Sequence, residues 1–243
     1  MNQSPATLIM GASRGIGLEL ARQSVAAGER VIATARDDAG LERLRTLGCQ
    51  ALRLDVADPV SVSGLAWQID GIRLRAAWYV AGVICNRANA TQPPAQQEFD
   101  RVMHTNVLGA MQLIAQVAPA LAASGVSGAS DAGGAGGAGG VLGRFGFISS
   151  GMGQIGTAGS SDAWLYRVSK AALNMAAVSA RHSYPGVLFA VFHPGWVQTD
   201  MGGAQAPVTA QESASGLRAT LARLGPEHNG GFFNHRGASM QGW

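Results

Sequence analysis

Two side chains that can perform acid–base chemistry together stand four residues apart in this sequence. Tyr166 and Lys170 open a predicted helix, where residues at that spacing share one face. Lys170 is the only lysine among 18 basic residues, and an ammonium differs from a guanidinium where a tunable charge is needed. A phenol has a pKa of about 10, and a neighbouring ammonium favours its phenolate form. The pair predicts a tyrosine general acid–base whose pKa Lys170 lowers; the alternative is two unrelated residues on a helix surface.

Two serines follow a predicted strand ahead of that helix. The apolar run 145–148 indicates the strand, and Ser149 and Ser150 come directly after it. A hydroxyl at this place can hydrogen-bond the oxygen of a substrate carbonyl, and either serine could supply it.

A glycine-rich turn lies between the first predicted strand, 7–10, and the next helix. Gly11, Gly15 and Gly17 let the backbone approach a pyrophosphate closely, and the helix N-terminus at Ile16 offers free N–H groups. The spacing differs from the usual dinucleotide fingerprint, so a plain strand–helix turn is the alternative.

The end of the second predicted strand, 31–35, bears on the choice of cofactor. NAD sites commonly place an acid there for the ribose 2′-hydroxyl, whereas an arginine accommodates the 2′-phosphate of NADP. This strand ends at Arg36 with no acid before it, and Arg14 lies inside the glycine turn. Either arginine alone would be an ordinary surface residue. Together they favour NADP(H), with NAD(H) left open as the second choice.

The elements that position these residues alternate between apolar strands and helices. This alternation predicts parallel β–α–β units with right-handed crossovers. We expect strands at 7–10, 31–35, 51–54, 76–80, 145–148, 188–192 and 232–234, and helices at 16–27, 39–47, 59–69, 96–123, 164–182 and 212–224. The predicted fold class is α/β: one Rossmann domain over 1–243, a doubly wound parallel sheet of about seven strands with helices on both faces. Residues 124–140, rich in Gly, Ala and Ser, are expected to be a flexible loop without function.

Composition and charge exclude several classes of protein. Hydrophobic residues make up 47% of the 243, enough for a sizeable core, and charged residues only 14%. The net charge is +3, but the arginines are scattered singly, so nucleic-acid binding is not expected. No apolar stretch approaches the roughly 20 residues that span a bilayer, and residues 1–5 lack a signal-peptide pattern. Cys49 and Cys85 suit a reducing compartment, so we expect a cytoplasmic protein, with no membrane partner and no metal site.

With these motifs in place, the chain resembles the short-chain dehydrogenases/reductases over almost its whole length. The resemblance implies a catalytic tetrad of Asn106, Ser150, Tyr166 and Lys170, and Met152 with its following glycine favours Ser150 over the serine before it. It also implies a set of cofactor-binding residues. These are Gly11, Ser13, Arg14, Gly15, Ile16, Gly17, Arg36, Asp55, Val56, Ala81, Gly82, Tyr166, Lys170, Pro194, Gly195, Val197 and Thr199.

The resemblance implies NADPH-dependent reduction of a ketone or aldehyde, or oxidation of the corresponding alcohol. Ser150 would hold the carbonyl oxygen and Tyr166 would donate the proton. Lys170 would lower the phenol pKa, and Asn106 would position a water that links Lys170 to solvent. The partner would be a small-molecule substrate, and the habit of the family implies a homodimer or homotetramer.

The stretches 166–174 and 193–203 and the residue Trp243 are similar to a narrower group, the myxobacterial C-factor and the sniffer-type carbonyl reductases. That similarity keeps a second hypothesis open, a cofactor-binding signalling or regulatory protein with little turnover. An epimerase, dehydratase or enoyl reductase on the same scaffold is a further alternative, although the glycine and Tyr–Lys spacings argue against it.

One departure from the family pattern concerns the fourth predicted strand. The chain reads Tyr79-Val80-Ala81-Gly82 where the family has Asn-Asn-Ala-Gly, which puts the bracing of the central strands in question. The loops at 86–96, 152–164 and 200–212 are expected to form the substrate pocket. Their apolar residues indicate an apolar pocket or simple packing: Met152, Ile155, Trp164, Trp196 and Met201.

Overall fold

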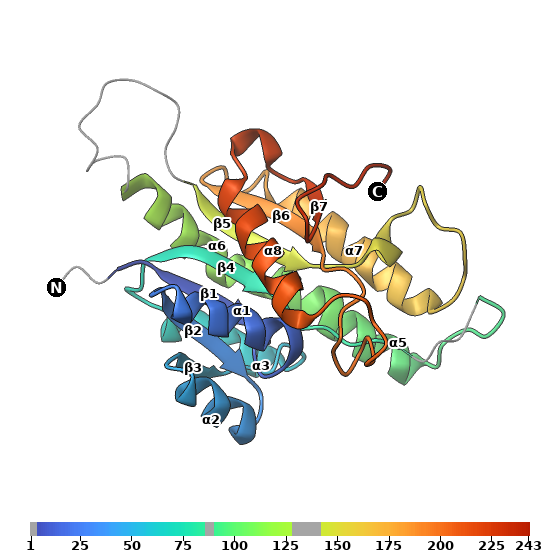
Figure 1. Cartoon of the computed structure of the whole chain (residues 1–243), viewed down its shortest axis with the longest axis horizontal. Helices are drawn as coiled ribbons and strands as arrows, with labels where there is room; N and C mark the ends of the chain where they lie inside the picture. The colour runs from blue at the N-terminus through green and yellow to red at the C-terminus, as the bar shows by residue number, and fades with distance from the viewer. Residues whose placement is uncertain (1–3, 86–89, 128–141) are drawn as a thin grey trace.

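The computed structural model describes residues 4–85, 90–127 and 142–243 (Figure 1). Seven strands form one sheet in the order β3-β2-β1-β4-β5-β6-β7, and all neighbouring strands are parallel. After β3 the chain crosses to the other side of β1, as in a doubly wound dinucleotide-binding sheet. Helices α1 and α8 lie on one face of the sheet, and α6 and α7 lie on the other. The predicted Rossmann architecture is confirmed.

The strands fall close to the predicted ranges. They are β1 (Ala6–Met10), β2 (Arg30–Ala35), β3 (Gln50–Arg53), β4 (Leu74–Tyr79), β5 (Gly143–Ile148), β6 (Val187–His193) and β7 (Phe232–Asn234). The α-helices are α1 (Gly15–Ala26), α2 (Asp38–Thr46), α3 (Pro59–Ser63), α4 (Leu65–Gln68), α5 (Gln96–Met103), α6 (Gly109–Ser127), α7 (Trp164–Ala180) and α8 (Ala210–Arg223). Short 3₁₀ turns cover Gly151–Gly153 and Pro226–His228.

Three predicted helical boundaries were wrong. The helix expected at 59–69 is two short helices, α3 and α4, which meet at Gly64. The helix expected at 96–123 is interrupted by one turn of π-helix at His104–Leu108. Its last part, α6, continues to Ser127, so 124–127 are helical where a loop was expected. The rest of the 124–140 segment lies outside the described residues.

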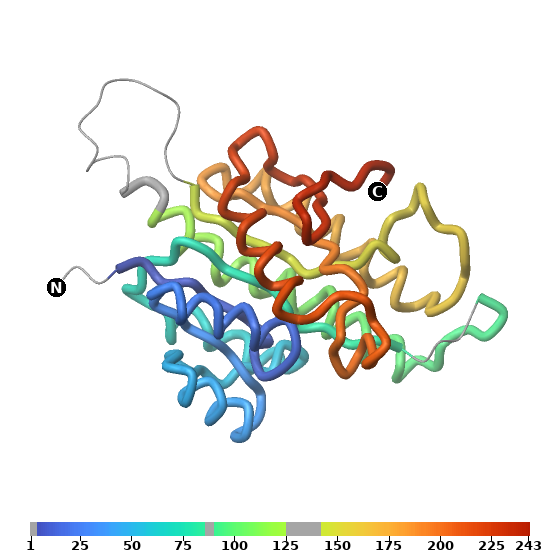
Figure 2. The backbone as a smooth tube through the Cα atoms, viewed as in Figure 1, coloured from blue at the N-terminus to red at the C-terminus, as the bar shows by residue number. Residues whose placement is uncertain are grey.

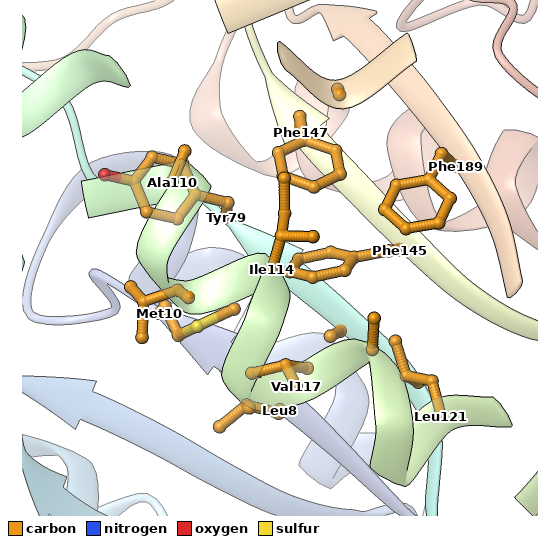
Figure 3. Close-up of a cluster of buried hydrophobic side chains, with 14 of the residues drawn as sticks. Leu8, Met10, Tyr79, Ala110, Ile114, Val117, Leu121, Phe145, Phe147 and Phe189 are labelled. Atoms are coloured by element: carbon orange, nitrogen blue, oxygen red, sulfur yellow. The ribbon is translucent and has the colours of Figure 1, made fainter. Parts of the chain in front are cut away.

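The core of the described chain consists of three apolar clusters: one on each face of the sheet, and a smaller one that contains Tyr166 and Cys85. The largest cluster joins strand side chains to α6 and α7. Figure 3 shows its centre, where Phe145, Phe147 and Phe189 lie together and Ile114 of α6 approaches them. The Phe145 and Phe147 ring centroids are 4.3 Å apart and those of Phe147 and Phe189 are 6.1 Å apart. This packing fixes β5 and β6, whose carboxyl ends lead into the loops of the candidate site.

One described helical stretch, Gln96–Ser124, is long and apolar enough to cross a membrane by length and composition alone. Within its most apolar window, 44% is buried inside the protein, against the sheet. The core helix of a globular protein passes the same test, so the finding is a weak indication of a span.

The π-helical turn is held in place by a side chain that the family pattern does not contain. Tyr79, at the end of β4, is fully buried, and its hydroxyl donates a hydrogen bond to the carbonyl of Thr105 in that turn. Gly109 begins the next helix beneath it, and a Cβ there would lie 3.0 Å from the Tyr79 hydroxyl and 2.5 Å from the Val56 carbonyl oxygen. Tyr79 therefore ties β4 to the helix that carries Asn106, which answers the question about strand bracing raised by the missing asparagines.

Replacing Tyr79 by phenylalanine should leave a buried carbonyl without its hydrogen bond. We expect Tyr79→Phe to lower the free energy of unfolding by about 1–2 kcal/mol in urea denaturation. Tyr184→Phe is the matched control, because the Tyr184 ring packs on Phe189 and its hydroxyl has no partner among the described residues. The control should change the unfolding free energy by less than about 0.5 kcal/mol. Equal losses in the two variants would contradict a role for the hydroxyl.

Candidate active site

The predicted site residues meet at the carboxyl edge of the sheet, where parallel strands place their binding loops. Figure 2 shows the turn after β1 and the loop after β6 side by side at this edge. A Cβ built on Gly15 of the turn would lie 3.1 Å from the methyl carbon of Thr199 in the loop. The turn also touches the segment after β4, because a Cβ on Gly11 would lie 2.7 Å from the backbone nitrogen of Ala81.

Tyr166 and Lys170 share the inner face of α7, as their spacing predicts. Tyr166 is 7% exposed and Lys170 only 3%. The Lys170 Nζ donates a hydrogen bond of 2.9 Å to the carbonyl of Ile148 at the end of β5 and lies 5.6 Å from the centre of the Tyr166 ring. The helix therefore brings a phenol and an ammonium together against the strand end that leads to Ser150.

Burial dominates the acid–base behaviour of both groups. It lowers the pKa of Lys170 to about 8, because the charged ammonium loses its solvation. It raises the pKa of Tyr166 to about 12; a hydrogen bond with Ser150 opposes that rise, and Cys85 adds to it. The pKa of Tyr166 is thus raised, whereas the sequence predicts that Lys170 lowers it. The reason is that burial removes the solvation of the phenolate, and this outweighs the lowering effect of the Ser150 hydrogen bond.

The two serines after β5 have different surroundings. Ser149 is 2% exposed, and its hydroxyl donates a 2.6 Å hydrogen bond to Asn174 on α7. Ser150 is half-buried, accepts a 3.1 Å hydrogen bond from the backbone of Met152, and interacts with the Tyr166 hydroxyl. The choice that the sequence left to a resemblance thus has a geometric basis: Ser149 belongs to the core network, and Ser150 lies beside the phenol.

Asn106 lies in the π-helical turn and is fully buried. Its amide donates to the Val83 carbonyl and to the Ser169 hydroxyl, both at 2.9 Å, and its oxygen accepts from the Val83 N–H at 2.8 Å. A Cβ on Gly82 would lie 3.4 Å from the Lys170 Nζ and 3.5 Å from the Asn106 oxygen. Asn106 therefore fixes the segment after β4 beside the lysine through its side chain.

The glycine turn has the shape of an anion cradle. The first turn of α1 contains no acidic residue, and Arg14 at the N-cap position makes no side-chain cap hydrogen bond, so the first N–H groups stay available. Gly11 has a φ of 89°, and a Cβ on Gly17 would lie 2.2 Å from the Gly11 carbonyl oxygen. A side chain at either glycine would collide with the backbone of the protein itself, so glycine is what allows so tight a turn between β1 and α1. The residues present therefore fit a dinucleotide.

The predicted phosphate-binding arginines lie on the outer side of this cradle. Arg14 forms a 3.0 Å ion pair with Asp200, and both side chains are largely exposed. Arg36 is exposed at the end of β2. The carboxylate that follows it, Asp37, accepts a 2.7 Å hydrogen bond from the Gly40 N–H and caps α2. The negative charge nearest to Arg36 in sequence is therefore engaged with the backbone.

The remaining predicted cofactor residues also lie along this edge. Asp55 and Val56 follow β3, and the Asp55 carboxylate accepts a 3.0 Å hydrogen bond from the Ala57 N–H. After β6, Gly195 has a φ of 90°, and Val197 is buried. The Pro194 carbonyl accepts a 2.8 Å hydrogen bond from Ser213 of α8.

Sequence reasoning missed several residues that support the site. Thr34 accepts a 3.1 Å hydrogen bond from the Gly11 N–H, and Arg43 of α2 donates to the Ser13 carbonyl, so two neighbouring elements hold the glycine turn. Ser169, one residue before Lys170, supports Asn106. The ring of His235 lies under the loop after β6, since a Cβ on Gly195 would be 3.1 Å from it. Only Ser169 carried a signal in the sequence, its place within the Tyr–Lys motif.

The described residues contain no group of three or more His, Cys, Asp or Glu side chains that could hold a metal ion.

Comparison with known proteins gives the class of this protein. The family model for short chain dehydrogenases matches residues 5–209. The chain therefore belongs to the short-chain dehydrogenase family, and it is an oxidoreductase of the nicotinamide-dependent kind.

Individual relatives agree with this class. The 1-hydroxy-2-glutathionyl-2-methyl-3-butene dehydrogenase of a Rhodococcus species is 30% identical over 96% of this chain and 98% of its own length. The C-signal of Myxococcus xanthus is 40% identical over 99 residues, which are 40% of this chain and 60% of that protein. Among solved structures, carbonyl reductase Sniffer of D. melanogaster superposes with a TM-score of 0.88, at 28% identity over 99% of this chain and 100% of that one. NADPH-bound carbonyl reductase from chicken fatty liver has a TM-score of 0.84, also at 28% identity over 99% and 100%.

The depressed pKa of Lys170 makes a prediction about stability. The folded ammonium loses its proton above about pH 8, whereas the unfolded chain keeps it to about pH 10.5, so the unfolded state binds more protons in between. Lys170 should therefore raise the free energy of unfolding by about 2 kcal/mol between about pH 7.5 and 9.5 in urea denaturation, and the raised pKa of buried Cys49 should offset a smaller part of this rise at the upper end of that range. Lys170→Met should remove this slope. Tyr166→Phe should keep it, because the raised pKa of Tyr166 acts only above pH 10. A flat wild-type profile would contradict the burial argument.

Proposed function

We propose that this protein reduces the carbonyl group of a ketone or aldehyde with NADPH, and oxidises the alcohol in the reverse direction. The observation that carries the proposal is the cluster of Ser150, Tyr166 and Lys170 at the carboxyl edge, next to a glycine cradle fitted to a dinucleotide. Similarity to an NADPH-bound carbonyl reductase and to Sniffer supports the choice of reaction.

Each catalytic side chain has a role that its surroundings support. Bound NADPH supplies the hydride. Ser150 holds the carbonyl oxygen, and Tyr166 gives its phenolic proton to that oxygen as negative charge develops on it. Because burial raises the pKa of Tyr166 to about 12, the phenol is in its proton-donating form at neutral pH. Lys170, with a pKa of about 8, can return a proton to the phenolate. Its ammonium lies 5.6 Å from the centre of the Tyr166 ring and helps to orient that ring. Asn106 holds the segment beside Lys170; a water relay to solvent at this place stays a prediction.

The proposed preference for NADPH over NADH rests on positive charge where the adenosine part of the cofactor would lie. Arg14 and Arg36 are the guanidiniums available to a 2′-phosphate, and β2 ends in buried Ala35 without an acid. The cofactor would lie along the whole predicted set, from the glycine turn through Asp55 and Val56 to the loop after β6. NAD(H) remains the second choice of cofactor.

A second candidate function rests on the similarity to C-signal. A chain of this kind could bind the cofactor and act in signalling with little turnover, and the 99 matched residues are the observation that favours it. The two functions differ in one measurable property, which is turnover in the presence of a carbonyl substrate.

Assembly and location are also proposals. The outer faces of α6 and α7 carry exposed apolar side chains: Met111 is 51% exposed, Val168 43% and Met175 66%. An apolar face of this kind is typical of a subunit contact, so we propose a homodimer or homotetramer.

Both cysteines are buried and unpaired, which suits a reducing compartment such as the cytoplasm. The substrate is a small molecule, and exposed Ile155, Trp196 and Met201 would give its pocket an apolar wall.

Substitutions of Tyr166 and of the two adjacent serines test the proposed catalytic roles. We expect Tyr166→Phe to lower NADPH oxidation, followed by absorbance with a panel of aldehydes, ketones and quinones, by about 10²–10⁴-fold. Ser150→Ala should lower it by about 10²-fold. Ser149→Ala, the matched control, should keep the rate and lose about 1–3 kcal/mol of unfolding free energy through Asn174.

The outcomes of that assay separate the hypotheses. NADPH binding without turnover across the panel would favour the signalling candidate. Failure to bind either cofactor would overturn the proposed function altogether, and a larger rate loss in Ser149→Ala than in Ser150→Ala would reverse the serine assignment.

Substitution of the two arginines tests the cofactor preference. Arg14→Ala and Arg36→Ala should each raise the KM for NADPH by about 10-fold and change that for NADH little, because only NADPH carries the 2′-phosphate. Arg45→Ala is the control, since Arg45 is an exposed residue of α2 that pairs with Glu42. Equal effects on both cofactors would show that the arginines do not read the 2′-phosphate.

A further inference from the structure

A cavity lies at the opposite end of the sheet from the candidate active site. It has a volume of about 610 Å³, within the range of small-molecule sites, and is lined by the starts of β1, β4 and β5 and by α1 and α8. Figure 1 shows α1 and α8 on the same face of the sheet, over these strands. The same three strands end at the catalytic edge, and a strand of five or six residues is about 17–20 Å long. The cavity is therefore separate from the site proposed above.

The charge of this cavity is strongly positive. Four arginines line it, Arg73, Arg75, Arg144 and Arg218, against one acid, Glu29. The difference, four minus one, is +3, as large as the net charge of the whole chain. The arginines come from three separate parts of the sequence, so the fold has gathered charges that the sequence scatters.

Glu29 satisfies only two of these arginines. Its carboxylate is mostly buried, at 12% exposure, and accepts hydrogen bonds from Arg75 at 2.7 Å and Arg218 at 2.9 Å. Its other oxygen accepts a 2.9 Å hydrogen bond from the Thr7 hydroxyl. This acid is therefore fully engaged and cannot balance the remaining two guanidiniums.

Arg73 and Arg144 are the two that remain. The Nε atom of each is buried and has no hydrogen-bond partner in the part of the chain that the structure describes. Among the described residues, the Arg144 guanidinium donates one long hydrogen bond, 3.5 Å to the Leu224 carbonyl. Burial and the nearby charge of Arg75 lower the pKa of Arg144. Buried donors without acceptors are costly, and an oxyanion would supply the acceptors and the opposite charge.

The rest of the lining is a mixture of apolar side chains and four hydroxyl-bearing ones, Thr7, Ser24, Ser124 and Ser215. Trp78 is 2% exposed and lines the cavity from β4, and a Cβ on Gly146 would lie only 2.5 Å from its ring. Leu74, Ala76 and Leu221 are among the other apolar residues that line the cavity. A cavity with unpaired guanidiniums beside an apolar wall matches an amphipathic anion better than an inorganic one.

We propose that this cavity binds an organic anion, a carboxylate or phosphate monoester on an apolar body, with its oxyanion on Arg73 and Arg144 and its apolar part against Trp78. The site stands on its own residues and does not depend on the proposed carbonyl reduction.

Isothermal titration of the full chain, saturated with NADPH, tests the proposal with four ligands of one chain length and with inorganic phosphate. Decanoate and decyl phosphate should bind, and their relative affinities tell which oxyanion the site prefers. Decylamine and decanol should bind at least 10-fold more weakly, because they lack the negative charge. Inorganic phosphate should also bind at least 10-fold more weakly, because it lacks the apolar body.

Variants locate the binding. The double variant Arg73→Gln, Arg144→Gln should weaken decanoate binding at least 10-fold, and Arg45→Gln, far from the cavity, should leave it unchanged. Ala222→Trp, at an exposed position of the lining, should also weaken it at least 10-fold by filling space, and it carries the test if the double variant does not fold. Decanol binding as tightly as decanoate, no binding of either anion, or wild-type affinity in the folded variants would overturn the proposal.

Discussion

The buried ammonium of Lys170 is the constraint on which the catalytic edge depends. It is 3% exposed, its ammonium donates a hydrogen bond to the Ile148 carbonyl, and no described carboxylate forms an ion pair with it. A charge in that position destabilises the folded state, because a single hydrogen bond to a carbonyl does not replace its lost solvation. Close approach on every side keeps it there: a Cβ on Gly153 would lie 2.9 Å from the Lys170 backbone, and Gly82 leaves room for its Nζ. The tyrosine, the serine and the end of β4 are positioned around that lysine.

The parallel sheet gives the molecule two chemically different ends. At the carboxyl ends of β1, β4 and β5, glycines and a helix N-terminus leave backbone donors available, which suits a pyrophosphate. At the amino ends of the same strands, the donors are arginine side chains instead. The strands between are short and packed on both faces, so they hold the two ends at a fixed separation. The parallel topology thus places backbone N–H donors at one end of the sheet and arginine side-chain donors at the other.

Features of the fold and site that depend on neighbours in the sequence could be predicted, whereas features that depend on contacts between distant residues could not. Strand positions follow from local apolar runs, and the Tyr166–Lys170 pair follows from helix periodicity, so both were predicted correctly. The π-helical turn was not, because it depends on a tertiary contact, the Tyr79 hydroxyl on Thr105. The difference between Ser149 and Ser150 depends on partners in α7: Asn174, 25 positions from Ser149, and Tyr166 beside Ser150. The arginine cavity gathers residues 73, 75, 144 and 218, which have no spacing in common.

The pKa shifts show why motif chemistry alone gives the wrong direction for Tyr166. The sequence places an ammonium near a phenol, which by itself lowers the phenol pKa. Folding buries both groups. Burial destabilises the charged form of each group, so it favours the neutral phenol and the neutral amine. A neutral phenol is the form that donates a proton, whereas oxidation of an alcohol needs the phenolate. In the proposed reaction, the burial that makes Lys170 costly would therefore also favour reduction at neutral pH, and alcohol oxidation would become accessible only as the pH rises.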